Sequence, residues 1–121
     1  MYILIVDDSK AMRGIVMRAV KAAGFGGAAY QEAGNGAEAL VAIRAAPPDL
    51  VLTDWNMPEM SGFELIQALR AEGRQLKIGL VTSESDPGLR DQALAAGAMF
   101  VLCKPFTPEA VKAALQPVLA P

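Results

Sequence analysis

Side chains that could handle a phosphoryl group or a metal ion stand at the ends of short apolar runs in this chain. They are two neighbouring acids, a third acid, a hydroxyl and a lysine: Asp7, Asp8, Asp54, Thr82 and Lys104. If the ends of the runs meet in the fold, three like charges crowd one place, where acids either keep a proton or bind a cation. The chain has no histidine and one cysteine, so its oxygen ligands favour Mg²⁺ or a similar ion such as Mn²⁺.

A metal ion, an ammonium group and a hydroxyl around one carboxylate would form a cage for a tetrahedral dianion. The simplest chemistry at such a cage is phosphoryl transfer onto Asp54, which would give an acyl phosphate. The metal ion and Lys104 would neutralise the charge on the phosphoryl oxygens, and Thr82 would donate a hydrogen bond to one of them.

Each of these residues also has an ordinary structural interpretation. Asp7 and Asp8 could cap a helix, and Asp54 could be a turn residue. Lys104 could form a surface ion pair, and Thr82 is of a type that is common in strands. Matched chemistry at four separate strand ends is improbable by chance, so we favour the joint interpretation.

The elements that would position these residues alternate in type along the chain. Apolar or β-branched runs predict strands at Tyr2–Val6, Ala28–Glu32, Leu50–Thr53, Ile78–Thr82 and Met99–Cys103. Apolar residues at helical spacing, together with capping residues, predict helices at Lys10–Ala23, Ala37–Ala46, Phe63–Glu72, Pro87–Ala96 and Pro108–Leu115.

This alternation predicts an α/β fold, a parallel sheet with right-handed crossovers and helices on both faces. Function in such a sheet lies beyond the carboxyl ends of the strands, where the five residues stand. Asp86 and Thr107 are predicted N-caps, each followed by proline at the first helical position. Ala28–Glu32 is the most polar strand and is expected near an edge. Pro117 is expected to end or kink the last helix.

Length and composition narrow the class of protein. A chain of 121 residues predicts a single domain over residues 1–121. The net charge of −2, from 11 basic and 13 acidic residues, argues against a nucleic-acid partner. The lack of histidine excludes a Ser-His-Asp triad and a Cys–His pair. The first apolar run is too short for a signal peptide or a membrane span, so we expect a cytoplasmic protein without a membrane partner.

Segments along nearly the whole chain resemble the receiver domains of two-component signalling, in the single-domain form of the chemotaxis response regulators. The segments, in order, are Ile3–Ser9, Asp54–Gly62, Val81–Ser83, Gly97–Ala98 and Lys104–Thr107. The resemblance implies a flavodoxin-like doubly wound fold with strand order 2-1-3-4-5. It also implies that the Lys104–Pro105 peptide bond is cis.

The resemblance implies a role for each matching residue. Asp54 would be the phosphoacceptor, with Lys104 as the phosphate-binding lysine and Thr82 as the switch hydroxyl. Mg²⁺ or Mn²⁺ would be held by the acidic pair, by Asp54 and by a backbone carbonyl; Asp8 would be the more direct ligand of the pair. The residues of this shell are Asp7, Asp8, Asp54 and Asn56. Asn56 and Glu84 stand where the family tunes the lifetime of the phosphoryl group.

The position of the family's aromatic switch residue is occupied by Val101. Phe100 is aromatic but one place early, so in a strand its ring would face the opposite side of the sheet. Transmission of the signal by ring rotation is therefore in question, and Val101 marks a switch position without a ring or a hydroxyl.

These resemblances predict a phosphorylation-activated signalling switch with no attached output domain. The phosphodonor would be a histidine kinase or a phosphotransfer protein, and the output would be docking to a target protein. Such a switch is not an enzyme in the usual sense, although it catalyses its own phosphorylation and dephosphorylation. We expect a monomer or a weak dimer.

Three other functions match parts of the pattern. Residues 34–39 fit a G-x-G-x-x-A nucleotide fingerprint with Asp54 20 residues further on, although the strand before them is polar. An aspartyl-phosphate phosphatase also uses a strand-end aspartate, but the second acid it needs is replaced here by Asn56. A binding module that is never phosphorylated is the third alternative, and the presence of all five site residues argues against it.

Overall fold

A five-stranded parallel sheet forms the centre of the molecule in the computed structural model, which describes residues 1–83 and 87–119. The strands are β1 (Tyr2–Val6), β2 (Ala29–Ala33), β3 (Leu50–Thr53), β4 (Ile78–Thr82) and β5 (Phe100–Cys103). They lie in the order β2-β1-β3-β4-β5, and every neighbouring pair is parallel. The predicted strand order and fold class are confirmed.

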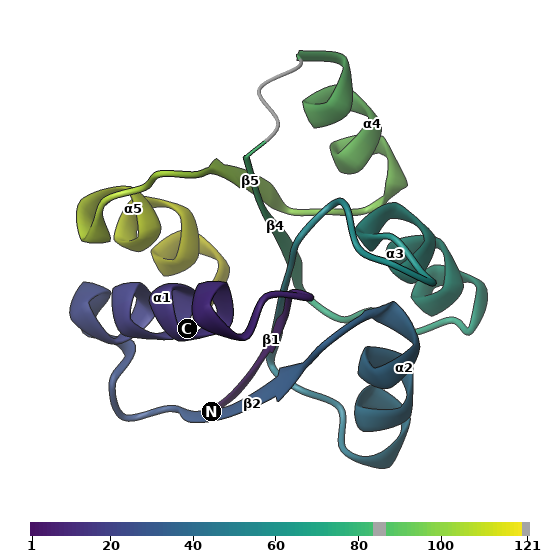
Figure 1. Cartoon of the computed structure of the whole chain (residues 1–121), viewed down its shortest axis with the longest axis horizontal. Coiled ribbons are helices and arrows are strands. Elements are labelled where there is room, and N and C mark those ends of the chain that lie inside the picture. The colour runs from purple at the N-terminus through teal and green to yellow at the C-terminus, as the bar shows by residue number, and fades with distance from the viewer. Residues whose placement is uncertain (84–86, 120–121) are drawn as a thin grey trace.

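Helices cover both faces of this sheet. They are α1 (Lys10–Val20), the π-type helical turn η1 (Lys21–Phe25), α2 (Gly36–Ala45), α3 (Gly62–Ala71), α4 (Pro87–Ala96) and α5 (Pro108–Leu119). α1 and α5 lie on one face, and α2, α3 and α4 lie on the other (Figure 1). Among the described residues, no helix has the length and apolarity that crossing a membrane requires.

The sheet is buried on both faces, which explains why its inner strands read as continuous apolar runs. Along β1, alternate side chains point to opposite faces. Ile3 and Ile5 join the core beneath α1 and α5, whereas Leu4 and Val6 join the core beneath α2, α3 and α4. All four side chains are at most 1% exposed. β1 is therefore fixed from both sides, and so is the loop that follows it.

The predicted ends of several elements differ from the structure, most of them by a single residue. The helix expected over Lys10–Ala23 is shorter: α1 ends at Val20, and η1 follows with Gly24 at a φ of 112°, which glycine adopts without a side-chain clash. β2 lies at the sheet edge, as predicted for the most polar strand, and runs one residue later than expected. The predicted N-cap Asp86 lies outside the described residues.

Of the two effects expected of Pro117, an end or a kink in the last helix, the first is wrong. α5 continues through Pro117 to Leu119. Proline removes one backbone donor from the ladder, but the final turn has other anchors. The Lys77 ammonium donates to the Val118 backbone carbonyl at 2.7 Å, and the Val118 and Leu119 side chains pack against the core beneath α1 and α5. These contacts hold the last turn in place.

Candidate functional site

The three acids meet because β1 and β3 are neighbours in the sheet. Val6 pairs with Thr53, so Asp7 and Asp54 leave adjacent strands at the same level. The Asp54 backbone N–H donates to the Val6 carbonyl at 2.9 Å, which continues the ladder to the site. Carboxylate oxygens of Asp7, Asp8 and Asp54 all lie within 4.8 Å of one another. Asp7 is buried, Asp54 is half-buried and Asp8 is exposed.

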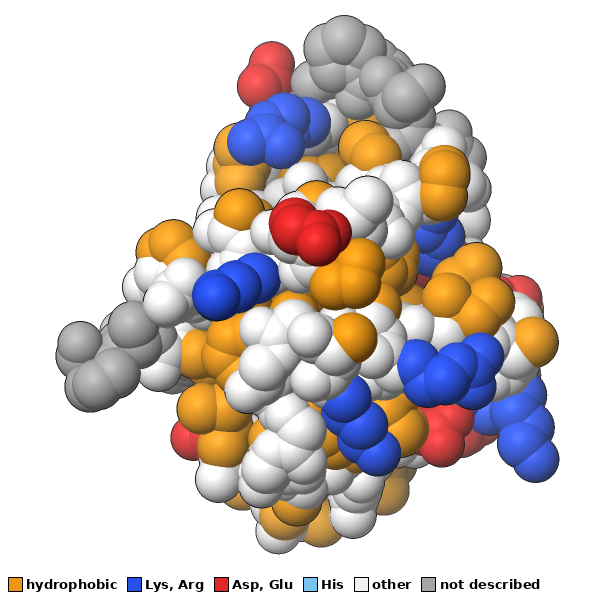
Figure 2. Space-filling view, turned by 90° about the vertical axis from the view of Figure 1, so that its left-hand side faces the viewer, with side chains coloured by type: hydrophobic (Ala, Val, Ile, Leu, Met, Phe, Trp, Pro, Cys, Tyr) orange, Lys and Arg blue, Asp and Glu red, His pale blue; other side chains and the backbone are white. Residues whose placement is uncertain are grey.

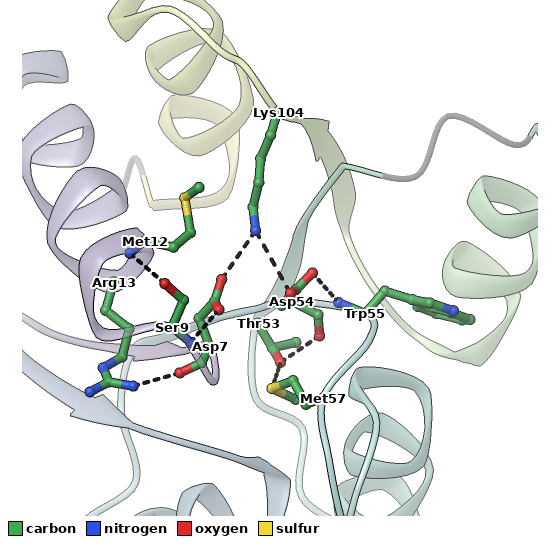
Figure 3. A network of polar contacts seen from close by, with 9 residues as sticks. All are labelled: Asp7, Ser9, Met12, Arg13, Thr53, Asp54, Trp55, Met57 and Lys104. Atoms are coloured by element: carbon green, nitrogen blue, oxygen red, sulfur yellow. Dashed lines mark hydrogen bonds and ion pairs between the residues drawn. The ribbon is translucent and has the colours of Figure 1, made fainter.

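Lys104 brings a fixed positive charge to these acids from the end of β5, which lies two strands from β3 and three from β1. Its backbone N–H donates to the Thr82 carbonyl at 2.7 Å, so the lysine begins level with the end of β4. Its Nζ lies 3.1 Å from Asp7 Oδ2 and 3.7 Å from Asp54 Oδ2 (Figure 3). The side chain is only 12% exposed. Lys104 is therefore not a surface ion pair, and its peptide bond to Pro105 is cis.

Ser9, and not an aspartate, caps α1. The Met12 backbone N–H donates to Ser9 Oγ at 3.2 Å. The Ser9 backbone N–H in turn donates to Asp7 Oδ1 at 2.9 Å. The helix-capping interpretation of the acidic pair is therefore not supported, and the Asp7 carboxylate is directed toward Lys104 and Asp54 (Figure 3).

Burial raises the pKa of the Asp54 carboxyl above its ordinary value. The charge of Lys104 and the hydrogen bond from the Trp55 backbone N–H to Asp54 Oδ1, at 2.8 Å, oppose this rise. The charges of Asp7 and Asp8 reinforce it. The negative charge of Asp54 is thus disfavoured in the metal-free protein and would be stabilised by a cation or by covalent modification.

The remaining predicted site residues lie around this centre. Thr82 ends β4 and is 1% exposed, opposite Cys103 in the register of β5. Asn56 is exposed, two residues beyond Asp54. Glu84 lies outside the described residues. The structure thus brings Thr82 to the same sheet edge as the acids and leaves the lifetime-tuning roles untested.

Val101 and Phe100 face opposite sides of the sheet, as predicted. Phe100 packs in the core beneath α1 and α5, whereas Val101 contacts the core beneath α2, α3 and α4. The Phe100 ring covers Gly79: a Cβ built there would lie 2.1 Å from the ring tip. The Phe100 ring therefore packs against Gly79 in the core beneath α1 and α5, on the opposite face of the sheet from Val101. It cannot take the place of a ring at position 101.

The nucleotide fingerprint at residues 34–39 has a structural explanation. The Asn35 side chain caps α2 by accepting from the Glu38 backbone N–H at 2.8 Å. The Gly34 backbone N–H donates to the Glu38 carboxylate at 3.2 Å. Backbone donors that would hold a phosphate in a dinucleotide site are therefore already occupied by the chain itself.

Two residues beside the site have no role assigned from the sequence: Arg13 lies outside every segment that carries the family resemblance, and Gly62 is only the last residue of the segment Asp54–Gly62. Arg13 donates from Nη1 to the Asp7 carbonyl oxygen at 2.6 Å. Gly62 begins α3 against the Asp54 backbone, where a Cβ would lie 2.2 Å from the Asp54 carbonyl oxygen. A basic residue within the first turns of a helix that follows two acids is the signal that could have indicated Arg13.

The donor set fits a hard divalent cation. Three carboxylates supply oxygen ligands within 4.8 Å of one another, and Mg²⁺ prefers a few carboxylates with water in its other positions. Asp8, the exposed member, leaves the group open to solvent. Asp7, Asp8 and Asp54 could together hold Mg²⁺ or Mn²⁺ next to the position that a phosphoryl group on Asp54 would take.

An apolar groove of about 530 Å³ adjoins Lys104. Its walls include Met12, Ile15 and Ala19 of α1 and Phe106 of the loop before α5. Ile15 is 45% exposed, although it is a large hydrophobic residue. On the side of the molecule that carries α1 and α5, hydrophobic side chains lie exposed between charged ones (Figure 2).

Known proteins are similar to this chain in sequence and structure over nearly its whole length. The family described as "Response regulator receiver domain" matches residues 3–116. Chemotaxis protein CheY1 of Helicobacter pylori is 38% identical, over 98% of this chain and 97% of its own. Chemotaxis protein CheY of Pseudomonas aeruginosa is 37% identical, over 98% and 95%. The chemotaxis response regulator CheY4 of Vibrio cholerae has a solved structure that superimposes with a TM-score of 0.84, at 36% identity over 98% of each chain.

Proposed function

The chain belongs to the response regulator receiver domain family, and on that premise we propose that it is a phosphorylation-activated switch with Asp54 as its phosphoacceptor. Receiver domains are signalling switches and not conventional enzymes. In the proposed cycle, the protein catalyses both its own phosphorylation and its own dephosphorylation.

One observation carries the proposal: the Lys104 ammonium lies between the Asp7 and Asp54 carboxylates, at 3.1 and 3.7 Å. An ammonium group buried among acids can stabilise the negative charge that develops on the oxygens of a phosphoryl group during transfer. A structural ion pair would need only one carboxylate. This site also places three carboxylates and the Thr82 strand end at the same sheet edge.

Phosphorylation transfers the phosphoryl group from the donor to a carboxylate oxygen. Asp54 Oδ2 is the oxygen next to Lys104, and we assign the attack on phosphorus to it. As the new O–P bond forms, the donor's P–N or P–O bond breaks, and the leaving group departs with the electron pair. Asp54 Oδ1 continues to accept a hydrogen bond from the Trp55 N–H, which fixes the plane of the carboxylate. A bound Mg²⁺ would neutralise charge on the phosphoryl oxygens.

After transfer, Lys104 pairs with a phosphoryl oxygen and the Thr82 hydroxyl donates to another. Asn56 and Glu84 then control how readily water reaches the acyl phosphate, and the backbone carbonyl of Asn56 would be a further ligand for a bound metal ion. Val101 contributes no ring and no hydroxyl, so the loop after Thr82 carries the change toward a target protein.

The phosphodonor is a histidine kinase or a phosphotransfer protein. The groove beside Lys104 is an apolar surface that adjoins the phosphoryl position, and we assign it to that donor. The exposed Ile15 side chain would be covered in the complex. The exchange takes place in the cytoplasm, with the protein as a monomer or weak dimer.

Mass spectrometry after incubation with acetyl phosphate and Mg²⁺ tests the proposal. The protein should gain about 80 Da, one phosphoryl group, and hydroxylamine should remove it. Asp54→Asn should abolish the gain, whereas Asp91→Asn, at an exposed position on α4, should retain it. A phosphoryl group mapped to a serine or threonine, or no gain in the wild type, would overturn the assignment.

A further inference from the structure

We propose that Arg13 is a positioning residue that sets the affinity of the acidic pair for a divalent cation. The inference rests on the proposed function, because it concerns the metal ion that phosphorylation of Asp54 would use. Arg13 lies one turn into α1. Its Nη1 donates to the Asp7 backbone carbonyl oxygen at 2.6 Å (Figure 3). Its Nε donates to the Glu32 carboxylate of β2 at 2.9 Å.

The geometry of this arginine distinguishes it from a surface ion pair. The Arg13 side chain is 16% exposed, whereas Arg44, which pairs with Glu72 away from the site, is 53% exposed. The planar guanidinium presents its donors in fixed directions, so Glu32 on one side holds the donor on the other side against the Asp7 carbonyl. Arg13 thereby ties α1 and the edge strand β2 to the first acid of the site.

Every polar group of Asp7 forms a hydrogen bond. Its N–H donates to the Ala33 carbonyl at 3.1 Å, and its two carboxylate oxygens accept from the Ser9 N–H and from Lys104. Its carbonyl oxygen accepts from Arg13. The peptide group is planar, so holding this oxygen also fixes the amide nitrogen of the next residue.

That next residue is Asp8, the exposed member of the metal group. Core packing does not orient an exposed carboxylate, yet its oxygen lies within 4.8 Å of those of Asp7 and Asp54. The orientation of the Asp7–Asp8 peptide group is therefore what aims Asp8 at the shared site. Arg13 holds that peptide group and so acts on the metal through Asp8.

Charge and positioning predict opposite effects of removing Arg13. A positive guanidinium beside the acids repels a second cation, so loss of its charge alone would tighten metal binding. Loss of a positioning contact would weaken metal binding, because the carboxylates would no longer be held in place. The direction of the change therefore separates the two roles.

Mn²⁺ binding tests the proposal, and the electron paramagnetic resonance signal of the free ion measures it. In Arg13→Gln, the Mn²⁺ dissociation constant should rise about tenfold, as for other residues that orient metal ligands. Arg13→Lys keeps the positive charge but lacks the planar guanidinium that donates in two fixed directions. The Mn²⁺ dissociation constant should therefore rise, by less than in Arg13→Gln. Arg44→Gln, the control, removes an arginine from a pair outside the site and should bind Mn²⁺ like the wild type.

Phosphorylation kinetics give a second readout. The defect lies in metal affinity, so the rate with acetyl phosphate should fall at low Mg²⁺ and recover at saturating Mg²⁺. A general loss of folding would lower the rate at both concentrations. Thermal unfolding in EDTA checks that each variant is folded. If Arg13→Gln is not, Arg13→Lys carries the test, because it keeps the positive charge and any rise in the Mn²⁺ dissociation constant then reports the lost guanidinium contacts.

The outcomes separate this inference from the proposed function. If the wild type binds Mn²⁺ and Arg13→Gln binds it as tightly or more tightly, Arg13 contributes only charge and the inference is overturned. If the wild type fails to bind Mn²⁺ or to become phosphorylated, the proposed function falls, and the inference falls with it. Weaker binding in Arg13→Gln with recovery at saturating Mg²⁺ supports the positioning role.

Discussion

Asp54 is held in a balance between groups that favour its charge and groups that oppose it. Burial raises its pKa, and the charges of Asp7 and Asp8 add to the rise. Lys104 and the Trp55 N–H act in the other direction, and the net direction is upward. Without a metal ion, the ionised form of Asp54 therefore costs the folded state some stability.

Replacing Asp54 with asparagine should stabilise the metal-free protein, against the general tendency of substitutions to destabilise. The asparagine removes a disfavoured charge and can still accept the Trp55 N–H. We expect the free energy of unfolding to rise by about 1 kcal/mol, which raises the melting temperature by about 4 °C at this chain length. Thermal unfolding in EDTA measures it, with Asp91→Asn as the control. A lower melting temperature for Asp54→Asn would mean that Lys104 outweighs the burial of the carboxylate.

The stabilisation by Asp54→Asn should depend on pH. Because the folded pKa of Asp54 is raised, the folded state binds more protons than the unfolded state between the two pKa values, and stability falls as pH rises there. The melting temperature of Asp54→Asn minus that of the wild type, in EDTA, should therefore grow from near zero at low pH and level off above the folded pKa. A difference that shrinks with rising pH would contradict the direction of the shift.

At the scale of elements, the connection from β3 to α3 is tightly constrained. The Gly62 N–H donates to the Trp55 carbonyl at 2.8 Å, and Ser61 and Glu64 form a reciprocal cap at the start of α3. Gly62 has no room for a side chain, because a Cβ would lie 2.2 Å from the Asp54 carbonyl oxygen. The start of α3 thus sets the backbone position of Asp54, the proposed phosphoacceptor.

Gly62→Ala should therefore be costly in both stability and activity. The new methyl group must push α3 away from the Asp54 backbone, at about 2 kcal/mol or more. We expect a melting temperature lower by several degrees and slower phosphorylation by acetyl phosphate. Gly27→Ala is the matched control, because a Cβ at Gly27 meets nothing within 4 Å. Equal melting temperatures for the two variants would show that α3 can shift freely.

At the scale of the whole molecule, the site exists only when the sheet is assembled. Its acids follow β1 and β3, and its lysine follows β5. The contact between Lys104 and Asp7 joins residues 97 positions apart. A divalent cation should consequently bind the folded state and not the unfolded chain, so metal binding and folding are linked.

Mg²⁺ should stabilise the wild type by about 1.4 kcal/mol at ten times its dissociation constant, a rise of about 5 °C in melting temperature. Asp8→Asn should lose most of this rise, because it removes the exposed ligand. Melting curves in EDTA and in Mg²⁺ measure the effect. NaCl at matched ionic strength controls for screening of the like charges. An equal rise with NaCl would mean that the acids are only screened and that no ion is bound.

Much of this arrangement follows from local sequence pattern. The alternation of strands and helices depends on local spacing of apolar residues, so the five strands could be predicted, and so could the gathering of Asp7, Asp54, Thr82 and Lys104 at the carboxyl ends of the strands. The opposite directions of Phe100 and Val101 follow from the period of a strand. The strand order came from the resemblance to a family, because pattern alone does not say which strands pair.

Other features depend on contacts between elements, and only the tertiary structure decided them. Pro117 is tolerated in α5 because Lys77, the residue before β4, donates to the backbone of the last turn of the helix. Arg13 reaches both Asp7 and Glu32 because β1 and β2 are paired neighbours in the sheet, which brings these two acids close together. Neither contact leaves a mark in local spacing, since each depends on where a distant side chain arrives after the sheet has formed.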